Sequence, residues 1–197
     1  MNGFIKLAGS IVLVSVLGGC SHAIQISPPI ENITSVNVEN KIDKSVAYHI
    51  SSEDRVKSVT TPGGGGDDVT YKPYADTEVA LNAMLSRVFS KVYSLEDGDN
   101  KAFIADKNIS YVFSTQVKTD SSSDSAFTWP PTDFTYELTC SAVDSSGANV
   151  WSKTVTSQGK AEFDEFKHDF SLSARRATED AYKKMLQEIA AAPEFRK

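Results

Sequence analysis

The sequence is poor in cysteine and in basic residues. Two cysteines, Cys20 and Cys140, among 197 residues cannot form the disulfide framework of a small secreted scaffold. The 20 Lys and Arg residues are outnumbered by 26 Asp and Glu residues, which leaves a net charge of -6. Because phosphate contacts need clustered positive charge, this balance argues against a nucleic-acid partner and against polybasic docking to acidic lipid. The apolar content of 40% is that of an ordinary globular chain.

The sequence also lacks the short motifs of common enzymes and metal sites. HExxH, CxxC and GxSxG do not occur. The glycines at 63–66 are followed by Asp67 and Asp68, which would repel the phosphate that a P-loop binds. A calcium-binding loop beginning at Asp97 would need a glutamate where the chain has Asn108. We therefore expect no cofactor, no metal and no enzymatic activity, although a catalytic triad assembled from distant residues stays open.

No apolar run is long enough to cross a membrane as a helix. The longest, Leu7 to Leu17, has the length of a signal-peptide core and follows Lys6, the one charged side chain in the first twenty residues. It ends in the small residues Gly18 and Gly19, directly before Cys20. This order predicts an exported protein with a signal peptide at residues 1–19. The alternative is a buried cysteine after a chance apolar run.

The four residues from Leu17 to Cys20 resemble a lipobox, the processing site of bacterial lipoproteins. By that resemblance Cys20 is the first mature residue, its sulfur carries diacylglycerol, and its amine carries a further acyl chain such as palmitate. Ser21 follows, where an Asp would signal retention in the inner membrane, so the resemblance favours the outer membrane. The mature chain would have a net charge of -7, because 19 basic and 26 acidic residues remain.

Residues 20–30 are expected to form an extended tether between the lipidated Cys20 and the folded domain. Pro28 and Pro29 favour extended backbone and block a helix. About ten extended residues reach at most about 35 Å, so partners should lie near the membrane. The remaining residues, 31–197, are enough for a single domain with its own core.

Apolar periodicity predicts both strands and helices in this domain. Alternation is cleanest in residues 134–143, where Cys140 falls on the apolar face, so Cys140 is interpreted as a core residue. A turn around Gly147 joins this strand to the next. Asp76 is a plausible N-cap for one helix, and Ser171 caps the other, which ends before Pro193. The predicted strands are 35–39, 44–52, 69–71, 109–118, 134–143 and 150–161, and the predicted helices are 77–93 and 172–191, with loop elsewhere in 51–75.

The order of these elements predicts an α+β fold. Runs of strands with two helices placed among them favour an antiparallel-rich sheet with both helices packed on one face, in a single domain.

Two connections are candidates for a functional surface. The loop at 119–133 contains Phe127 and Trp129 beside two prolines, and aromatic residues on such loops are common interface anchors. We predict partner binding there, with the alternative that Trp129 folds back to cap the core. The second connection, 162–170, combines many carboxylates with three phenylalanines. We interpret its phenylalanines as anchors and its acids as solvated, against the alternative of an acid–base pair.

The chain resembles the YajG-like family of bacterial outer-membrane lipoproteins. The residues that carry the resemblance are Leu17–Cys20, the segment Ile24–Ile30, and the hairpin Tyr136–Ala161 that runs through Glu162 and Phe163 into the last helix. The resemblance implies a lipoprotein of the outer membrane and brings no catalytic residues with it.

The sequence as a whole predicts a non-enzymatic, lipid-anchored accessory protein of the outer membrane that faces the periplasm. It would contact the membrane through its lipid and would bind another envelope protein, or a second copy of itself. The alternatives are a lipid-handling protein with an apolar groove, a subunit of a periplasmic secretion or assembly ring, and, least favoured, a hydrolase.

Overall fold

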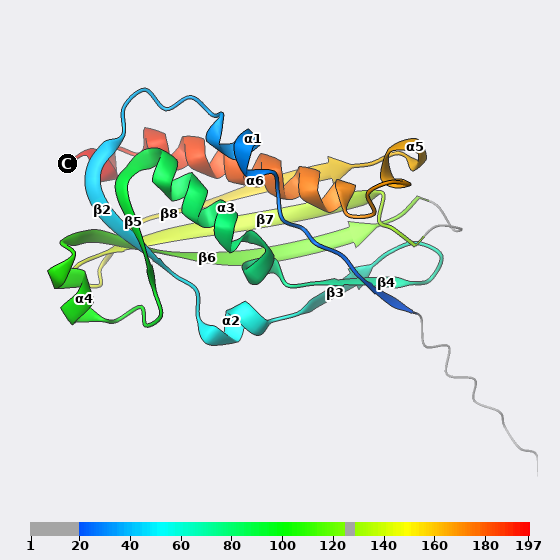
Figure 1. The fold of residues 1–197 in the computed structure, drawn as a ribbon, viewed down its shortest axis with the longest axis horizontal. Coiled ribbons are helices and arrows are strands. Elements are labelled where there is room, and N and C mark those ends of the chain that lie inside the picture. The colour runs from blue at the N-terminus through cyan, green and yellow to red at the C-terminus, as the bar shows by residue number, and fades with distance from the viewer. Residues whose placement is uncertain (1–19, 125–128) are drawn as a thin grey trace, which may run out of the picture.

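A five-stranded sheet is the central layer of the protein (Figure 1). The computed structural model describes residues 20–124 and 129–197, so the predicted signal peptide at 1–19 and Phe127 lie outside the described residues. The strand order is β5-β2-β6-β7-β8. The strands are β2 (Ile42–His49), β5 (Phe89–Leu95), β6 (Ile109–Ser122), β7 (Asp133–Asp144) and β8 (Asn149–Lys160).

The sheet combines antiparallel and parallel pairing. Strands β6, β7 and β8 form an antiparallel meander, which confirms the three strands and the turn predicted in this half of the chain. Strand β2 instead lies parallel to both β5 and β6. Parallel neighbours are joined by long crossovers rather than by tight turns, so no local sequence signal announces them.

A smaller three-stranded sheet lies at one end of the molecule. It consists of β1 (Ser21–Ala23), β4 (Asp68–Tyr71) and β3 (Val59–Pro62), in that order. Strand β4 confirms the brief strand predicted at 69–71. The rest of 51–75 is more structured than the predicted loop, because it also contains β3 and the short helix α2 (Ser52–Val56).

Two long helices cover one face of the central sheet (Figure 1). They are α3 (Pro73–Val88) and α6 (Leu172–Ala191), and α6 packs on β7 and β8. The predicted small-residue stripe of α6 faces the sheet, with exposed fractions of 0% for Ala174, Ala177, Ala181, Met185 and Ile189. The α+β fold with both helices on one face of the sheet is therefore confirmed.

The core between these layers follows from the alternation of β7. Its inward side chains are 0% or 1% exposed, namely Phe134, Tyr136, Leu138, Cys140 and Ala142. The predicted core position of Cys140 is confirmed. Burial without a compensating charge raises the pKa of its thiol to about 12, so Cys140 is not a reactive nucleophile.

The predicted helix at 77–93 is wrong at both ends. Helix α3 begins at Pro73, a residue suited to a first helical position, and ends at Val88. The chain then continues as β5, in which Val92 pairs with Val46 of β2. Val92 continues the helical apolar spacing, but parallel pairing with β2 determines its conformation. Asp76 lies inside the first turn, where its carboxylate accepts from the Lys72 and Ile26 backbone N–H groups at 3.4 Å.

The predicted strand at 35–39 does not form. The chain instead makes a short helix, α1 (Ile30–Thr34), followed by an irregular segment up to β2. Ile33 is fully buried, and Val36 and Val38 pack against the same core while partly exposed. The alternating valines thus find apolar contacts without any strand partner.

The predicted tether is also wrong, because most of it belongs to the fold. Strand β1 pairs with β4 immediately after Cys20, and Ile24 and Ile26 are buried in the core at 6% and 0% exposure. The backbone is extended, as the prolines predicted, but it lies along the domain rather than leading to it.

Three further short elements complete the described chain. They are α4 (Lys101–Asp106), α5 (Phe163–Phe166) and a 3-10 helix (Pro193–Arg196). Helix α6 ends before Pro193, as predicted, and Phe195 then packs against Phe89 and Phe113 in the core. Among residues 20–124 and 129–197, no helix has the length and apolar character needed to span a membrane.

Candidate functional site

Cys20 lies at the exposed start of strand β1. Its carbonyl oxygen accepts a hydrogen bond from the Asp68 N–H of β4 at 3.0 Å. The β1–β4 ladder then continues through the pair of His22 and Val69, and the Ile24 N–H donates to the Thr70 carbonyl at 3.0 Å. Cys20 is therefore attached directly to the folded domain, with no free segment between them.

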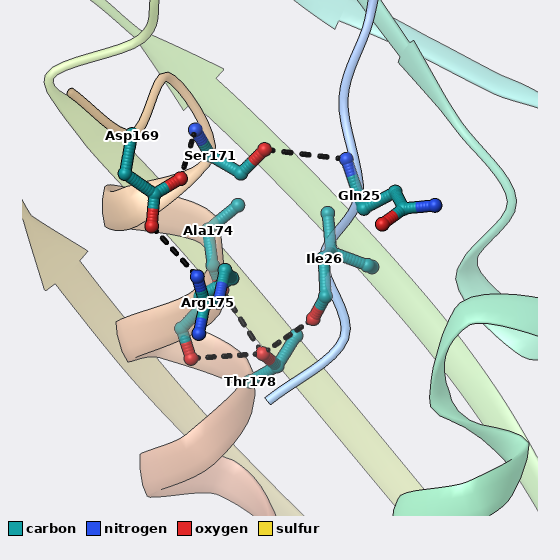
Figure 2. Close-up of polar contacts among 7 residues, drawn as sticks. All are labelled: Gln25, Ile26, Asp169, Ser171, Ala174, Arg175 and Thr178. Atoms are coloured by element: carbon teal, nitrogen blue, oxygen red, sulfur yellow. Dashed lines mark hydrogen bonds and ion pairs between the residues drawn. The ribbon is translucent and has the colours of Figure 1, made fainter. Parts of the chain in front are cut away.

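The residues after β1 are held against the start of helix α6 (Figure 2). The Thr178 hydroxyl donates to the Ile26 carbonyl at 2.7 Å, and the Gln25 N–H donates to the Ser171 hydroxyl at 3.3 Å. Ser171 was predicted to cap α6, but its side chain makes no cap hydrogen bond and instead accepts from Gln25. The N-terminal segment is thus held by side chains from the far end of the sequence.

On the other side of the same helix start, Asp169 organises the turn into α6 (Figure 2). Its carboxylate accepts from the Ser171 N–H at 3.1 Å and pairs with the Arg175 guanidinium at 2.7 Å. The turn also positions Phe170, whose side chain is 46% exposed, next to Trp129.

Trp129 lies between two other aromatic side chains near Cys20. Its indole stacks on the His22 ring with centroids 4.1 Å apart and an angle of 15°. The Phe170 ring contacts it at 4.8 Å, tilted by 58°. We call His22, Trp129 and Phe170 the aromatic row. Residues 125–128, which precede Trp129 and include Phe127, lie outside the described part of the chain.

The β3–β4 turn holds the aromatic row in place. His22 Nε2 lies 3.0 Å from the Asp67 carboxylate, and the Gly64 N–H donates to the Trp129 carbonyl at 2.9 Å. A Cβ atom at Gly63 would lie 2.2 Å from the Trp129 carbonyl oxygen, so only glycine fits this contact. The glycine run, which falls within the predicted loop at 51–75, therefore supports the backbone of Trp129.

The structure brings together two residues that the sequence singled out separately, Cys20 and Trp129. Sequence reasoning missed His22 and Phe170 as their neighbours. His22 fell within the predicted tether at 20–30. Phe170 was interpreted as an anchor of the connection at 162–170 rather than as a surface residue. The available signal was the glycine run, because consecutive glycines often mark a close approach of two backbones.

The acidic connection contains paired rather than free carboxylates at three positions. Asp169 pairs with Arg175 as described above, and Asp164 pairs with Lys167 at 2.9 Å. Glu165 accepts from Arg176 through both oxygens, at 2.8 and 3.1 Å. The Arg176 hydrogen bonds lower the pKa of Glu165 to about 2.

The three phenylalanines of this connection differ in burial. Phe166 is buried at 3% exposure, as predicted for an anchor. Phe163 is 60% exposed and Phe170 is 46% exposed, so the anchoring prediction is wrong for these two. Large aromatic side chains that stay this exposed mark a surface with apolar character.

Comparison with known proteins assigns no family to the chain. No family model matches it, and no curated protein matches its sequence. Among solved structures, it is similar to a DUF330 protein from Xanthomonas campestris, with 15% identity and a TM-score of 0.47 over 86% of this chain and 92% of the other. It is also similar to PelC from Paraburkholderia phytofirmans, solved as a dodecamer, with 17% identity and a TM-score of 0.47 over 84% and 94% of the two chains.

A third solved structure, a candidate lipoprotein from Caulobacter crescentus, has 12% identity and a TM-score of 0.38 over 85% of this chain and 96% of the other. All three TM-scores are below 0.5, so these similarities carry no conclusion about function. The YajG-like resemblance stays a prediction.

The geometry around Cys20 is suited to the attachment of a group to its thiol and to contact between the aromatic row and another surface. Cys20 itself is exposed, whereas the other thiol is buried and has a raised pKa. In the part of the chain that the structure describes, no group of three or more His, Cys, Asp and Glu residues could hold a metal ion. The features that distinguish this end of the molecule are therefore an accessible cysteine and a partly exposed aromatic row.

Proposed function

We propose that the protein is a non-enzymatic lipoprotein of the bacterial outer membrane, anchored through lipid on Cys20 and facing the periplasm. In this proposal it works as an accessory module that binds another envelope protein. The observation that carries the proposal is the exposed Cys20, which follows an apolar segment and two glycines in the sequence and is hydrogen-bonded to strand β4 through its carbonyl.

The exposure of Cys20 supports a lipid anchor on physical grounds. Acyl chains on its sulfur and amine could enter a bilayer without displacing any core residue. Each buried methylene contributes about 0.8 kcal/mol, so one chain holds a protein weakly while two or more hold it firmly. A Cys20 that carries three acyl chains would therefore hold the domain firmly at the membrane.

The proposal of a non-enzymatic role rests on what the reactive side chains do. The Cys140 thiol is buried with a pKa of about 12, and His22 is stacked on Trp129 and paired with Asp67. His49 Nδ1 lies 3.1 Å from the Leu95 carbonyl, and its ring packs against Gly98. These groups have structural partners, which favours a binding role over catalysis.

A surface away from Cys20 offers a place for the protein partner. Val56 of α2 and Val79 of α3 are the most exposed large apolar residues of the described chain, at 70% and 65%. Each directly follows a member of the ion pair between Arg55 and Glu78, so the two valines flank the same contact. We propose this α2–α3 surface as the first partner site to test, with Trp129 as the alternative.

Photocrosslinking in the native envelope tests the proposal. A photoreactive residue is placed at Val79, at Trp129 and, as a control on the polar sheet face, at Thr154. One dominant protein product from position 79 or 129, absent from position 154, would support an accessory role and identify the partner. Self-products alone would replace that partner by a second copy of this chain. The absence of any protein product at both test positions would contradict the proposal.

A further inference from the structure

We propose that the aromatic row formed by His22, Trp129 and Phe170 rests on the lipid surface that holds the anchor, so that the domain sits on the membrane in one fixed orientation. This inference rests on the proposed lipidation of Cys20. It assigns to the row a lipid contact, in place of the protein contact that the sequence predicted for Trp129.

No free tether separates Cys20 from strand β1. The Cys20 carbonyl is hydrogen-bonded to the Asp68 N–H at 3.0 Å, and β1 continues in register with β4. A lipid on Cys20 is thus attached to a residue that the small sheet already holds. The end of the domain around β1 must then lie against the bilayer, because there is no slack that would let it swing away.

The direction of the side chains places the aromatic row beside Cys20. In an extended chain, residues two apart lie on the same side and about 7 Å apart, so Cys20 and His22 share one side of β1. The His22 ring then stacks on Trp129, which contacts Phe170. The aromatic row thus begins at His22, two residues from the proposed anchor, and continues across the same end of the domain.

The side chains of the aromatic row have the chemistry that suits a lipid headgroup region. Tryptophan and similar amphipathic rings favour the headgroup region of a bilayer, where the ring body is apolar and the polar atoms stay hydrated. Phe170 is 46% exposed and the His22 side chain is 33% exposed, so the row has accessible edges to place there. Without a bilayer, the exposed part of the Phe170 ring is in contact with water instead.

Acidic side chains near the aromatic row have partners within the domain. Asp169 is paired with Arg175 and Glu165 with Arg176, and the Asp67 carboxylate lies 3.0 Å from His22 Nε2. A carboxylate that is paired with an arginine within the domain is repelled less by lipid phosphates than a free one, because the nearby cation offsets its charge. These pairs allow an overall acidic protein to place this end on a lipid surface.

The two tryptophans provide a matched pair for the experiment. Trp129 belongs to the aromatic row, whereas Trp151 stands near the start of β8 and packs on Phe195 at 5.4 Å. Figure 1 shows the start of β1 and α5 at one end of the molecule, and the C-terminus and α4 at the other. One tryptophan therefore reports on each end.

The test measures the quenching of tryptophan fluorescence by spin-labelled lipids. Full-length protein with Trp151→Phe keeps only Trp129, and protein with Trp129→Phe keeps only Trp151. Both are purified from membranes and reconstituted into phosphatidylethanolamine and phosphatidylglycerol vesicles that carry a nitroxide near the headgroup. We expect Trp129 fluorescence to fall about twofold while Trp151 is unchanged, since only residues at the headgroup level come within range of that nitroxide. Unquenched Trp129 on vesicle-bound, lipid-bearing protein would overturn the inference.

Two further measurements separate this inference from the proposed function. If Cys20 carries no lipid by mass spectrometry, the proposed anchor fails, and this inference fails with it. A photoreactive residue at Phe170 then compares the possible occupants in the native envelope. Crosslinks to phospholipid are expected, whereas a dominant crosslink to a protein would overturn the lipid contact. Phe170→Ala in the Trp151→Phe background should reduce the quenching of Trp129, and Thr154→Ala, a change to an exposed residue on the polar face of the sheet, should not.

Discussion

Gly159 of β8 shows how closely single residues determine the packing of this fold. A Cβ atom at this position would lie 2.0 Å from the Ser173 carbonyl oxygen and 2.5 Å from the Ala177 nitrogen. Both atoms belong to the backbone of helix α6, so neither can move aside without moving the helix. The small-residue stripe of α6 predicted such a close approach, but the glycine that meets it on the sheet could not be identified without the pairing of β7 and β8.

Replacing Gly159 with alanine should therefore destabilise the protein. We expect the free energy of unfolding to fall by about 1–3 kcal/mol, because overpacking forces the helix away from the sheet. Unfolding in urea, followed by circular dichroism, measures the change. The neighbouring exposed substitution Gln158→Ala is the control and should change the same free energy by less than about 0.5 kcal/mol. Equal effects of the two changes would contradict the close helix contact.

Among the helices and strands, the sequence correctly predicted the ones that have strong local periodicity. The β6–β7–β8 meander and helix α6 were found because alternation, a glycine turn and a 3.6-residue stripe are local signals. The parallel strand β5 was missed because its apolar spacing also fits the end of a helix. Strand β1 was missed because its partner, β4, is distant in the sequence and its polar residues have no alternating pattern.

The burial of the N-terminal segment can be tested with Ile26→Ala. Ile26 is fully buried, and the loss of a buried isoleucine side chain typically costs about 2–5 kcal/mol of unfolding free energy. If residues 20–30 formed a free tether, Ile26→Ala would leave the unfolding free energy unchanged. The adjacent exposed residue supplies the control, Gln25→Ala, whose effect should stay below about 0.5 kcal/mol. Urea unfolding of both variants distinguishes an N-terminal segment that is part of the core from a flexible leader.

The connection between α5 and α6 should make stability depend on pH. Arg176 lowers the folded-state pKa of Glu165 from 4.5 to about 2. A lowered pKa stabilises the fold above the unfolded-state value, and this contribution is lost as the pH falls from about 4.5 to about 2. Glu165→Gln should thus be less stable than the parent at neutral pH and equal to it near pH 2.

Unfolding free energies measured across this pH range would test that expectation. Asp164→Asn, which removes one negative charge from the same short helix, is the control for a general charge effect. If Glu165→Gln and the parent differ by the same amount at all pH values, the ion pair with Arg176 does not provide the expected contribution.

At the scale of the whole molecule, the two ends of the domain differ in character. One end carries the exposed Cys20, the aromatic row and the β3–β4 turn, and the other carries α4 and the C-terminus (Figure 1). The sequence identified Cys20 through its position after an apolar segment and Trp129 through its loop. It could not place them together, because their proximity depends on β1 pairing with β4 and on the contact between Gly63 and Trp129.

Mass spectrometry of the N-terminal peptide from native membranes is the most direct measurement of the central claim. Trypsin should release a peptide of residues 20–41, because Lys41 is the first cleavage site after Cys20. We expect this peptide to begin at Cys20 and to carry a diacylglyceryl group on sulfur and an acyl chain on the amine. An unmodified peptide running from Leu7 to Lys41, still joined across Gly19 and Cys20, would contradict it.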